Sequence, residues 1–172
     1  MSLRIAVTGG SGRIGRAVVK ELVARGHTVL NLDRRASRDR GLARFCYVEL
    51  TRREQVQPVL EQVDAVIHLG EITHSSAPFS PDEIFSHNIR AAAVVLQTAA
   101  DLGLRRAIYT SSCQVYGCWD EPSVPPVFVP LTEDHPLQPQ NVYALSKVTN
   151  ETFARFVNKT TGLPIAIFRL PW

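Results

Sequence analysis

The sequence predicts an α/β fold of the Rossmann class: a doubly wound parallel sheet, strand order 3-2-1-4-5-6, in a three-layer α/β/α arrangement. Three observations predict it. Short apolar runs alternate with longer amphipathic segments along the chain, as in proteins built from βα units. Glycines at positions 9, 12 and 15 join the first apolar run to the first amphipathic segment. The segment AVIHL at 65–69 forms one largely apolar run, which is typical of a parallel strand buried on both faces.

Each expected strand is one of these short runs. The six strands are expected at 4–8, 28–32, 44–48, 65–69, 106–111 and 165–170. The first helix carries Ile14, Val18, Leu22 and Val23 on one face and ends at Gly26, because glycine often follows a last helical turn.

Later helices are marked by their ends. Thr51 and Ser80 are each followed three residues later by Glu, which predicts a capping box at both positions. Pro58 should shorten or kink the first of these helices. The second runs to about residue 102 and a further helix covers 142–160. Residues 118–141 hold more than half of the 11 prolines and are expected to form a long irregular loop.

The composition is that of one folded domain. Of 172 residues, 45% are hydrophobic and 20% are charged, which excludes an intrinsically disordered chain. No run of 18 apolar residues or apolar leader occurs, so we expect neither a membrane span nor a secretory signal. Cys46, Cys113 and Cys118 lack metal-ligand spacing and indicate reduced thiols in the cytoplasm without a metal. The net charge of +3 does not indicate a nucleic-acid partner.

The glycine-rich turn predicts a dinucleotide site. Gly9 permits the tight turn, Gly12 lets the backbone approach a pyrophosphate, and Gly15 lets the helix pack on the strand. Arg13 and Ile14 open the helix, whose free amides would meet the phosphates.

Asp33 ends the second expected strand, where a carboxylate can accept hydrogen bonds from the adenosine ribose. It would repel a 2′-phosphate, so the sequence favours NAD over NADP. Arginines follow at 34, 35, 38, 40 and 44, and guanidinium groups suit phosphate. Three interpretations of this cluster stay open: a solvated loop, NADP binding through Arg34, or contact with nucleic acid.

Two further motifs are SSCQVYG at 111–117 and YALSK at 143–147. With the glycine turn, they resemble the extended short-chain dehydrogenase/reductase family, NAD-dependent epimerase/dehydratase type. DAVIHL at 64–69 and residues 164–169 share the resemblance. It implies that Ser112, Tyr143 and Lys147 are catalytic. The resemblance also implies that the cofactor is contacted by the glycine turn, Asp33 and Arg34. It adds contacts from Glu49, Leu50, Leu69, Gly70, Asn88, Tyr143 and Lys147.

Tyr143 and Lys147 lie four residues apart on an expected helix and therefore share one face. Free tyrosine has a pKa of about 10 and is a poor base at neutral pH. The ammonium, together with a positive nicotinamide, would lower that pKa towards the working pH. Ser112 ends a strand at the same edge of the sheet and could orient the substrate oxygen. The alternative is a tyrosine–lysine pair on a solvated helix surface.

The chain departs from the family pattern at three places. Cys113 and Gln114 stand where the dehydratases have carboxylates, which disfavours dehydration. Glu49 replaces an aspartate near the adenine. Gly70 and Glu71 replace two small residues after the fourth strand.

Two histidines flank this last segment. His68 is expected to be a packed strand residue rather than a catalyst. His74 is either a substrate contact or a solvated loop residue.

The family continues past its sixth strand into a substrate-binding lobe. We expect residues 1–172 to be the NAD(P)-binding Rossmann domain without that lobe, as a piece of a longer chain or a natural short form. The resemblance implies an NAD-dependent epimerase or dehydrogenase that transfers hydride from a sugar or nucleotide sugar, with Tyr143 as acid/base. The alternative is an NAD(P)-binding sensor or scaffold without turnover. A homodimer through helices 81–102 and 142–160 is also implied.

Overall fold

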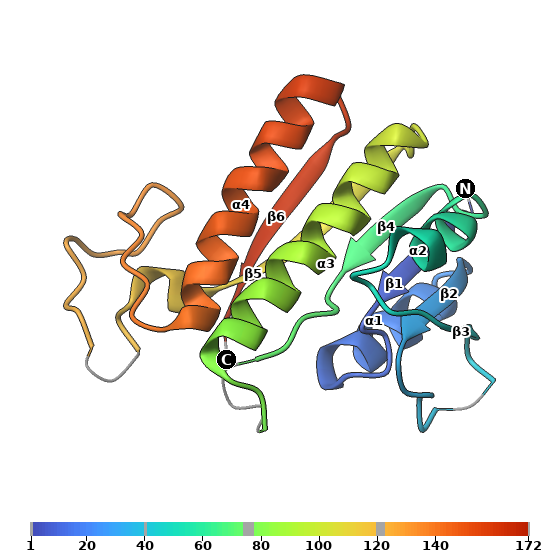
Figure 1. Ribbon diagram of the computed structural model, residues 1–172, viewed down its shortest axis with the longest axis horizontal. Coiled ribbons are helices and arrows are strands. Elements are labelled where there is room, and N and C mark those ends of the chain that lie inside the picture. Colours follow the sequence, from blue (N-terminus) through green and yellow to red (C-terminus); the bar gives the residue numbers. More distant parts are fainter. Residues whose placement is uncertain (1, 40, 74–77, 120–122, 172) are drawn as a thin grey trace.

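The computed structural model describes residues 2–39, 41–73, 78–119 and 123–171. Its six strands form one parallel sheet in the order β3-β2-β1-β4-β5-β6, which confirms the predicted order (Figure 1). The strands are β1 (Arg4–Thr8), β2 (Thr28–Asp33), β3 (Arg44–Tyr47), β4 (Ala65–His68), β5 (Arg106–Ser112) and β6 (Ile165–Leu170). The helices are α1 (Arg13–Ala24), α2 (Arg53–Leu60), α3 (Pro81–Asp101) and α4 (Val142–Thr161), with a short 3₁₀ helix η1 (Cys113–Tyr116).

The strand order reverses at β1, which pairs with β2 on one side and with β4 on the other. Thr8 at the end of β1 lies opposite His68 at the end of β4. Ligands of doubly wound sheets bind beyond the carboxyl ends of the strands at such a reversal.

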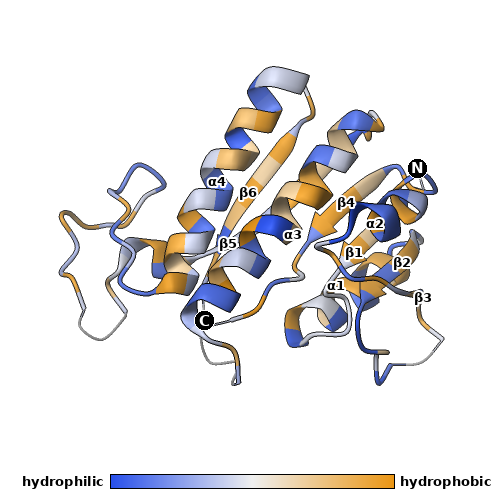
Figure 2. Cartoon of the chain, viewed as in Figure 1, coloured by the Kyte–Doolittle hydropathy of each residue, from blue (hydrophilic) through white to orange (hydrophobic). Residues whose placement is uncertain are grey.

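Two hydrophobic cores lie on the two faces of the sheet. The larger one packs α2, α3 and α4 against the strands, and the smaller one packs α1 against β1 and β2. Figure 2 shows hydrophobic residues concentrated in the strands and both hydrophobic and hydrophilic residues on the helices. Within the described chain, α1 is the helix that covers the second face, and Phe168 of β6 is half-exposed. The three-layer arrangement is therefore complete over the centre of the sheet and open near β6.

Helix ends test the capping predictions. At α3 the Ser80 side chain accepts from the Glu83 amide and the Glu83 carboxylate accepts from the Ser80 amide, so this capping box is confirmed. The predicted capping box at Thr51 is wrong, because α2 starts from Arg52 without a side-chain cap. The Thr51 hydroxyl donates instead to Glu49 Oε1 at 3.2 Å. Pro58 lies inside this helix of eight residues.

Ile14 differs from the prediction for α1. It is 44% exposed, whereas Val18, Leu22 and Val23 pack against the smaller core. Ile14 lies in the first turn, beyond the cover of the sheet, and it lines a cavity instead.

The segment from Gly117 to Gln140 contains neither helix nor strand in its described residues, as predicted. His135 is buried within it, and its Nε2 accepts from the Val127 amide at 2.9 Å. The three cysteines are free thiols. No helix in the described part of the chain combines the length and apolarity needed to cross a lipid bilayer.

Candidate active site

The glycine turn between β1 and α1 fits a phosphate-binding role. Gly9 has φ +65°, and a Cβ there would lie 2.7 Å from Gly70 Cα on the segment after β4. A Cβ on Gly15 would overlap the Gly9 carbonyl oxygen, whereas one on Gly12 would meet only that oxygen at 3.2 Å. The turn is therefore closed towards the protein and open on one side. Gly12 caps α1 without a side chain, which leaves amide donors of the first turn for an anion.

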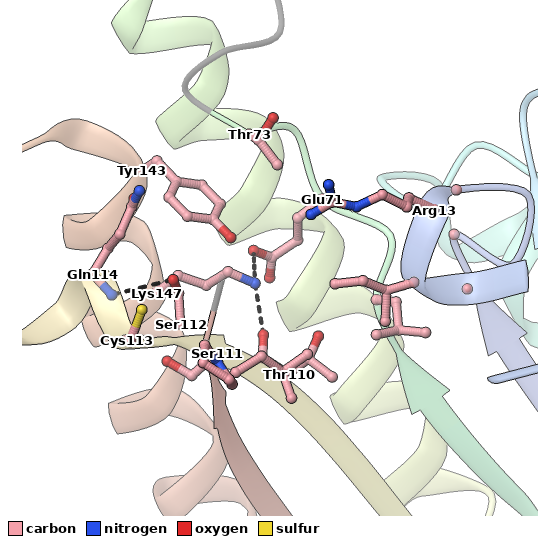
Figure 3. Close-up of a pocket in the computed structure, with 17 residues that line it drawn as sticks. Arg13, Glu71, Thr73, Thr110, Ser111, Ser112, Cys113, Gln114, Tyr143 and Lys147 are labelled. Atoms are coloured by element: carbon pink, nitrogen blue, oxygen red, sulfur yellow. Dashed lines mark hydrogen bonds and ion pairs between the residues drawn. The ribbon is translucent and has the colours of Figure 1, made fainter. Parts of the chain in front are cut away.

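Two cavities meet at this turn, with volumes of about 460 Å³ and about 180 Å³. Both are lined by Gly9, Gly12, Leu69 and Glu71. The larger also contains Tyr143 (Figure 3), and the smaller contains Asp33. A two-part site joined at a phosphate-binding turn fits a dinucleotide, with one nucleotide in each part.

The predicted site residues fall into these two cavities with one exception. The larger is lined by Gly9, Gly12, Arg13, Ile14, Gly15, Leu69, Ser112, Tyr143 and Lys147, and the smaller adds Asp33, Arg34, Glu49, Leu50 and Gly70. Asn88 lines neither cavity. Its buried amide donates to and accepts from the backbone of Ile72 at 2.9 and 2.8 Å. Asn88 therefore holds the segment after β4 in place. The resemblance had implied a cofactor contact from Asn88, but this side chain does not face the cofactor cavity. His74 lies outside the described residues.

The smaller cavity has an acidic wall. Asp33 accepts from the amides of Ser11 at 3.1 Å and Arg35 at 3.0 Å. Arg34 pairs with Glu49 at 3.4 Å. Burial alone would raise the pKa of Glu49, but hydrogen bonds from Thr51 and the charge of Arg34 outweigh it, so the pKa of Glu49 is lowered. The pairing with Glu49 offsets the attraction that Arg34 would exert on a 2′-phosphate.

The predicted catalytic side chains come together from two elements. Tyr143 and Lys147 lie in the first two turns of α4, which Asn141 caps by accepting from the Ala144 amide. Ser112 ends β5, and its hydroxyl accepts from the Gln114 amide at 3.2 Å. Lys147 Nζ lies 5.4 Å from the centre of the Tyr143 ring.

The pKa of Tyr143 does not follow the expected direction. Burial raises it above its ordinary value, and the charge of Glu71 adds to that effect. The charge of Lys147 and a hydrogen bond with Ser112 act in the lowering direction without prevailing. Lys147 therefore lowers this pKa as expected, but burial and the charge of Glu71 outweigh the ammonium, so the pKa of Tyr143 is raised overall.

That second charge belongs to Glu71, which the sequence analysis noted only as a departure from the family pattern. Its side chain is 3% exposed, and Oε2 lies 2.6 Å from Lys147 Nζ (Figure 3). Lys147 Nζ also donates to the Thr110 carbonyl at 2.6 Å. A glutamate three residues after the end of β4, beside the glycine turn, was the available signal, but the sequence does not specify its partner.

His68 is packed, as predicted. It is fully buried in β4, and its Nδ1 lies 2.7 Å from Thr8 Oγ1. Burial lowers the pKa of His68 to about 4. The imidazole is therefore neutral at pH 7, and its 3.7 Å approach to Glu71 is not an ion pair there.

A family model described as the NAD dependent epimerase/dehydratase family matches residues 5–171. The chain belongs to this family. Membership confirms the family predicted from the motifs, and the family's name confirms NAD as its cofactor. The dinucleotide geometry of the two cavities agrees with this assignment.

Several relatives are nucleotide-sugar enzymes. A UDP-glucose 4-epimerase of Lactobacillus helveticus is 30% identical over 97% of this chain and 51% of the relative. A probable dTDP-glucose 4,6-dehydratase of Sinorhizobium fredii is 29% identical over 96% of this chain and 52% of the relative. The chain spans about half the length of the curated relatives it matches.

Solved structures agree on the fold. A short-chain dehydrogenase/reductase superfamily protein from Agrobacterium tumefaciens with bound NAD has a TM-score of 0.86 and 35% identity, over 96% of this chain and 48% of that protein. A UDP-galactose 4-epimerase has a TM-score of 0.83 and 27% identity, over 96% of this chain and 55% of that enzyme.

Proposed function

We propose that this chain is the NAD-binding part of an epimerase or dehydrogenase acting on a sugar or nucleotide sugar, with Tyr143 as acid/base. The observation that carries the proposal is that Tyr143, Ser112 and Lys147 line one cavity that meets the glycine turn. The nucleotide-sugar relatives support the substrate class. The whole enzyme includes a second, substrate-binding lobe in this proposal.

In this proposal different residues contact different parts of the cofactor. The open side of the glycine turn and the amides of α1 would hold the pyrophosphate, and Asp33 would accept from the adenosine ribose. Lys147 would donate to the nicotinamide ribose from the wall of the larger cavity. When bound, NAD supplies the acceptor for the hydride that leaves the sugar carbon.

Tyr143 then handles the proton of the same carbon's hydroxyl. Ser112, hydrogen-bonded to Tyr143, can orient that oxygen so that the proton passes to the Tyr143 phenolate oxygen as the carbonyl forms. In an epimerase Tyr143 would give the proton back to the same oxygen when the carbonyl is reduced from its other face. In a dehydrogenase the ketone is released.

The scarcity of carboxylates in the larger cavity favours an epimerase or dehydrogenase over a dehydratase. Dehydration needs an acid and a base beside the sugar. Cys113 and Gln114 stand at the positions where the dehydratases have carboxylates. Among the described lining residues of the larger cavity, Glu71 is the carboxylate, and it is paired with Lys147.

The test uses calorimetry and absorbance. The chain should bind NAD in a calorimetric titration. With bound NAD and UDP-glucose or UDP-galactose, the full-length protein should either accumulate reduced cofactor, seen at 340 nm, or convert one UDP-sugar into the other, seen by chromatography. Tyr143→Phe should bind NAD nearly as well as the parent and lose about 10²–10⁴ in the rate of either reaction. NAD binding with neither reduction nor interconversion of sugar substrates would favour a sensor or scaffold module instead.

A homodimer through α3 and α4 is part of the proposal. The alanine-rich stretch of α3 does not form the contact surface, because Ala91, Ala92 and Ala99 are buried in this chain's own core. Leu145 and Phe156 of α4 are 45% and 58% exposed, which supports a contact through the outer side of α4.

A further inference from the structure

Glu71 and Lys147 form an ion pair that is almost completely removed from water. Their side chains are 3% and 4% exposed, and the carboxylate and ammonium are 2.6 Å apart. A buried charge without a partner is strongly destabilising, and a buried pair is tolerated when hydrogen bonds satisfy both groups. Each side chain therefore compensates the buried charge of the other.

The carboxylate is held from more than one side. Its Oε1 accepts from the Tyr109 hydroxyl of β5 at 3.0 Å and from the Asn150 amide of α4 at 3.2 Å. Tyr109 and Asn150 are themselves buried, at 0% and 1% exposure. Two buried donors aimed at one oxygen make the position of Glu71 a built feature of the site.

The pair stands next to Tyr143. Lys147 Nζ lies 5.4 Å from the Tyr143 ring and 5.2 Å from the Tyr109 ring. The charges that face Tyr143 are Lys147 of α4 and Glu71 of the segment after β4, with the Cys113 thiol of η1 as a further titratable group. His68 of β4 lies beyond Glu71 and is neutral at pH 7, because burial lowers its pKa to about 4.

We propose that Glu71 is a positioning residue of this active site, which holds the Lys147 ammonium against the Thr110 carbonyl and cancels much of the positive charge that Lys147 presents to Tyr143. The proposal rests on the proposed function of Tyr143 as acid/base. It assigns a role to a residue that stands where the resembled family has a small side chain.

The consequence is that Tyr143 stays protonated in the site without cofactor. Burial raises its pKa, and Glu71 adds to that effect against Lys147. Deprotonation of Tyr143 then requires further positive charge in the cavity, of the kind that an oxidised nicotinamide carries. Glu71 would thereby link the basicity of Tyr143 to the presence of the oxidised cofactor.

The test follows Tyr143 directly by NMR in the chain labelled with ¹³Cζ-tyrosine. The protein has four tyrosines, and Tyr143→Phe identifies the signal of Tyr143. In Glu71→Gln the pKa of Tyr143 should fall by about one to two pH units. The Glu71 carboxylate lies 2.6 Å from Lys147 Nζ, which lies 5.4 Å from the centre of the Tyr143 ring, and Coulomb's law at an effective dielectric constant of about 20 gives a shift of this order. Labelling the three lysines at ¹³Cε reports whether Lys147 keeps its charge.

The matched control is Glu151→Gln. Glu151 is a fully buried carboxylate on the same helix, and it pairs with Arg169 rather than Lys147. Its loss should shift the titration of Tyr143 by clearly less than the loss of Glu71, because Glu151 lies about 12 Å further along α4 than Tyr143. A general loosening of the fold would change both variants alike, so equal shifts in the two variants would contradict the proposal.

The proposal is overturned if Tyr143 titrates at the same pH in Glu71→Gln as in the parent while Lys147 keeps its charge. If Glu71→Gln does not fold, Glu71→Asp decides, because its shorter side chain withdraws the charge from Lys147. The pKa of Tyr143 should then fall by a smaller amount, and an unchanged value overturns the proposal. The titration needs neither cofactor nor substrate, so failure of the parent to bind NAD would count against the proposed function alone.

Discussion

Acidification should destabilise this protein through His68, the buried histidine of β4. Thr8 Oγ1 accepts from the amides of Leu69 and Gly70, each at 3.1 Å, so its own proton is directed to His68 Nδ1 at 2.7 Å. This arrangement requires the neutral ring with its proton on Nε2. Protonation of Nδ1 would break the contact that ties the end of β4 to the glycine turn.

The magnitude follows from the pKa of His68. Burial lowers it from 6.5 to about 4, whereas the unfolded chain takes up the proton near the ordinary value. Stability is therefore fully present above pH 6.5 and is lost as the pH falls towards 4. Proton linkage gives a loss of about 3 kcal/mol in all, of which about 2 kcal/mol falls between pH 7 and pH 5.

Urea unfolding monitored by circular dichroism at pH 7 and pH 5 measures this loss. The comparison is with His68→Asn, whose amide can still meet the Thr8 hydroxyl but does not titrate. Carboxylate contributions are common to both proteins and cancel in the comparison. The parent should lose about 2 kcal/mol more than His68→Asn between the two pH values. Equal losses in the two proteins would refute the assignment of a neutral, buried His68.

Three further predictions concern the cofactor, the core and the assembly. Asp33→Ala should weaken NAD binding at least about tenfold, or about 1.4 kcal/mol, and should strengthen NADP binding in calorimetric titrations; no change in either affinity would place Asp33 away from the ribose. Arg169→Met should destabilise the fold by about 3 kcal/mol, because it removes the bidentate partner of the fully buried Glu151. Its melting temperature should therefore be lower than that of the parent, and an unchanged melting temperature would contradict this. If the protein dimerises through α4, Leu145→Glu and Phe156→Glu should each yield monomers in light scattering, and a parent that is already monomeric at high concentration would exclude this dimer.

The strand order and the glycine turn were predictable from the sequence because their signals are local. Apolar runs of strand length separated by helical segments admit few arrangements once crossovers are right-handed. The closeness of Tyr143 and Lys147 follows in the same way, since residues four apart on a helix share one face. The prediction for Ser80 succeeded because a capping box is formed by residues within one turn.

Local signals also misled where a competing partner existed elsewhere in the structure. Thr51 has the spacing of a capping box, but its hydroxyl donates to Glu49 instead. Asn88 was expected to face the cofactor, yet its amide is used entirely inside the protein, on Ile72 and Ser146. In both cases the sequence indicated that the polar side chain has a role, but it did not identify the hydrogen-bond partner of that side chain.

The sequence by itself determined the fold, because apolar runs, the glycine turn and helix ends are local signals. It also singled out Ser112, Tyr143 and Lys147, which the structure places in one cavity. Only the tertiary structure decided that Glu71 meets Lys147, and hence that Tyr143 is less acidic than a nearby ammonium alone would make it. Glu71 precedes β5 in the chain and Lys147 follows it in α4. The fold brings both side chains to the same edge of the sheet. The physical reason is that a pKa depends on burial and on every charge within a few ångströms, and those neighbours are fixed by packing rather than by sequence distance.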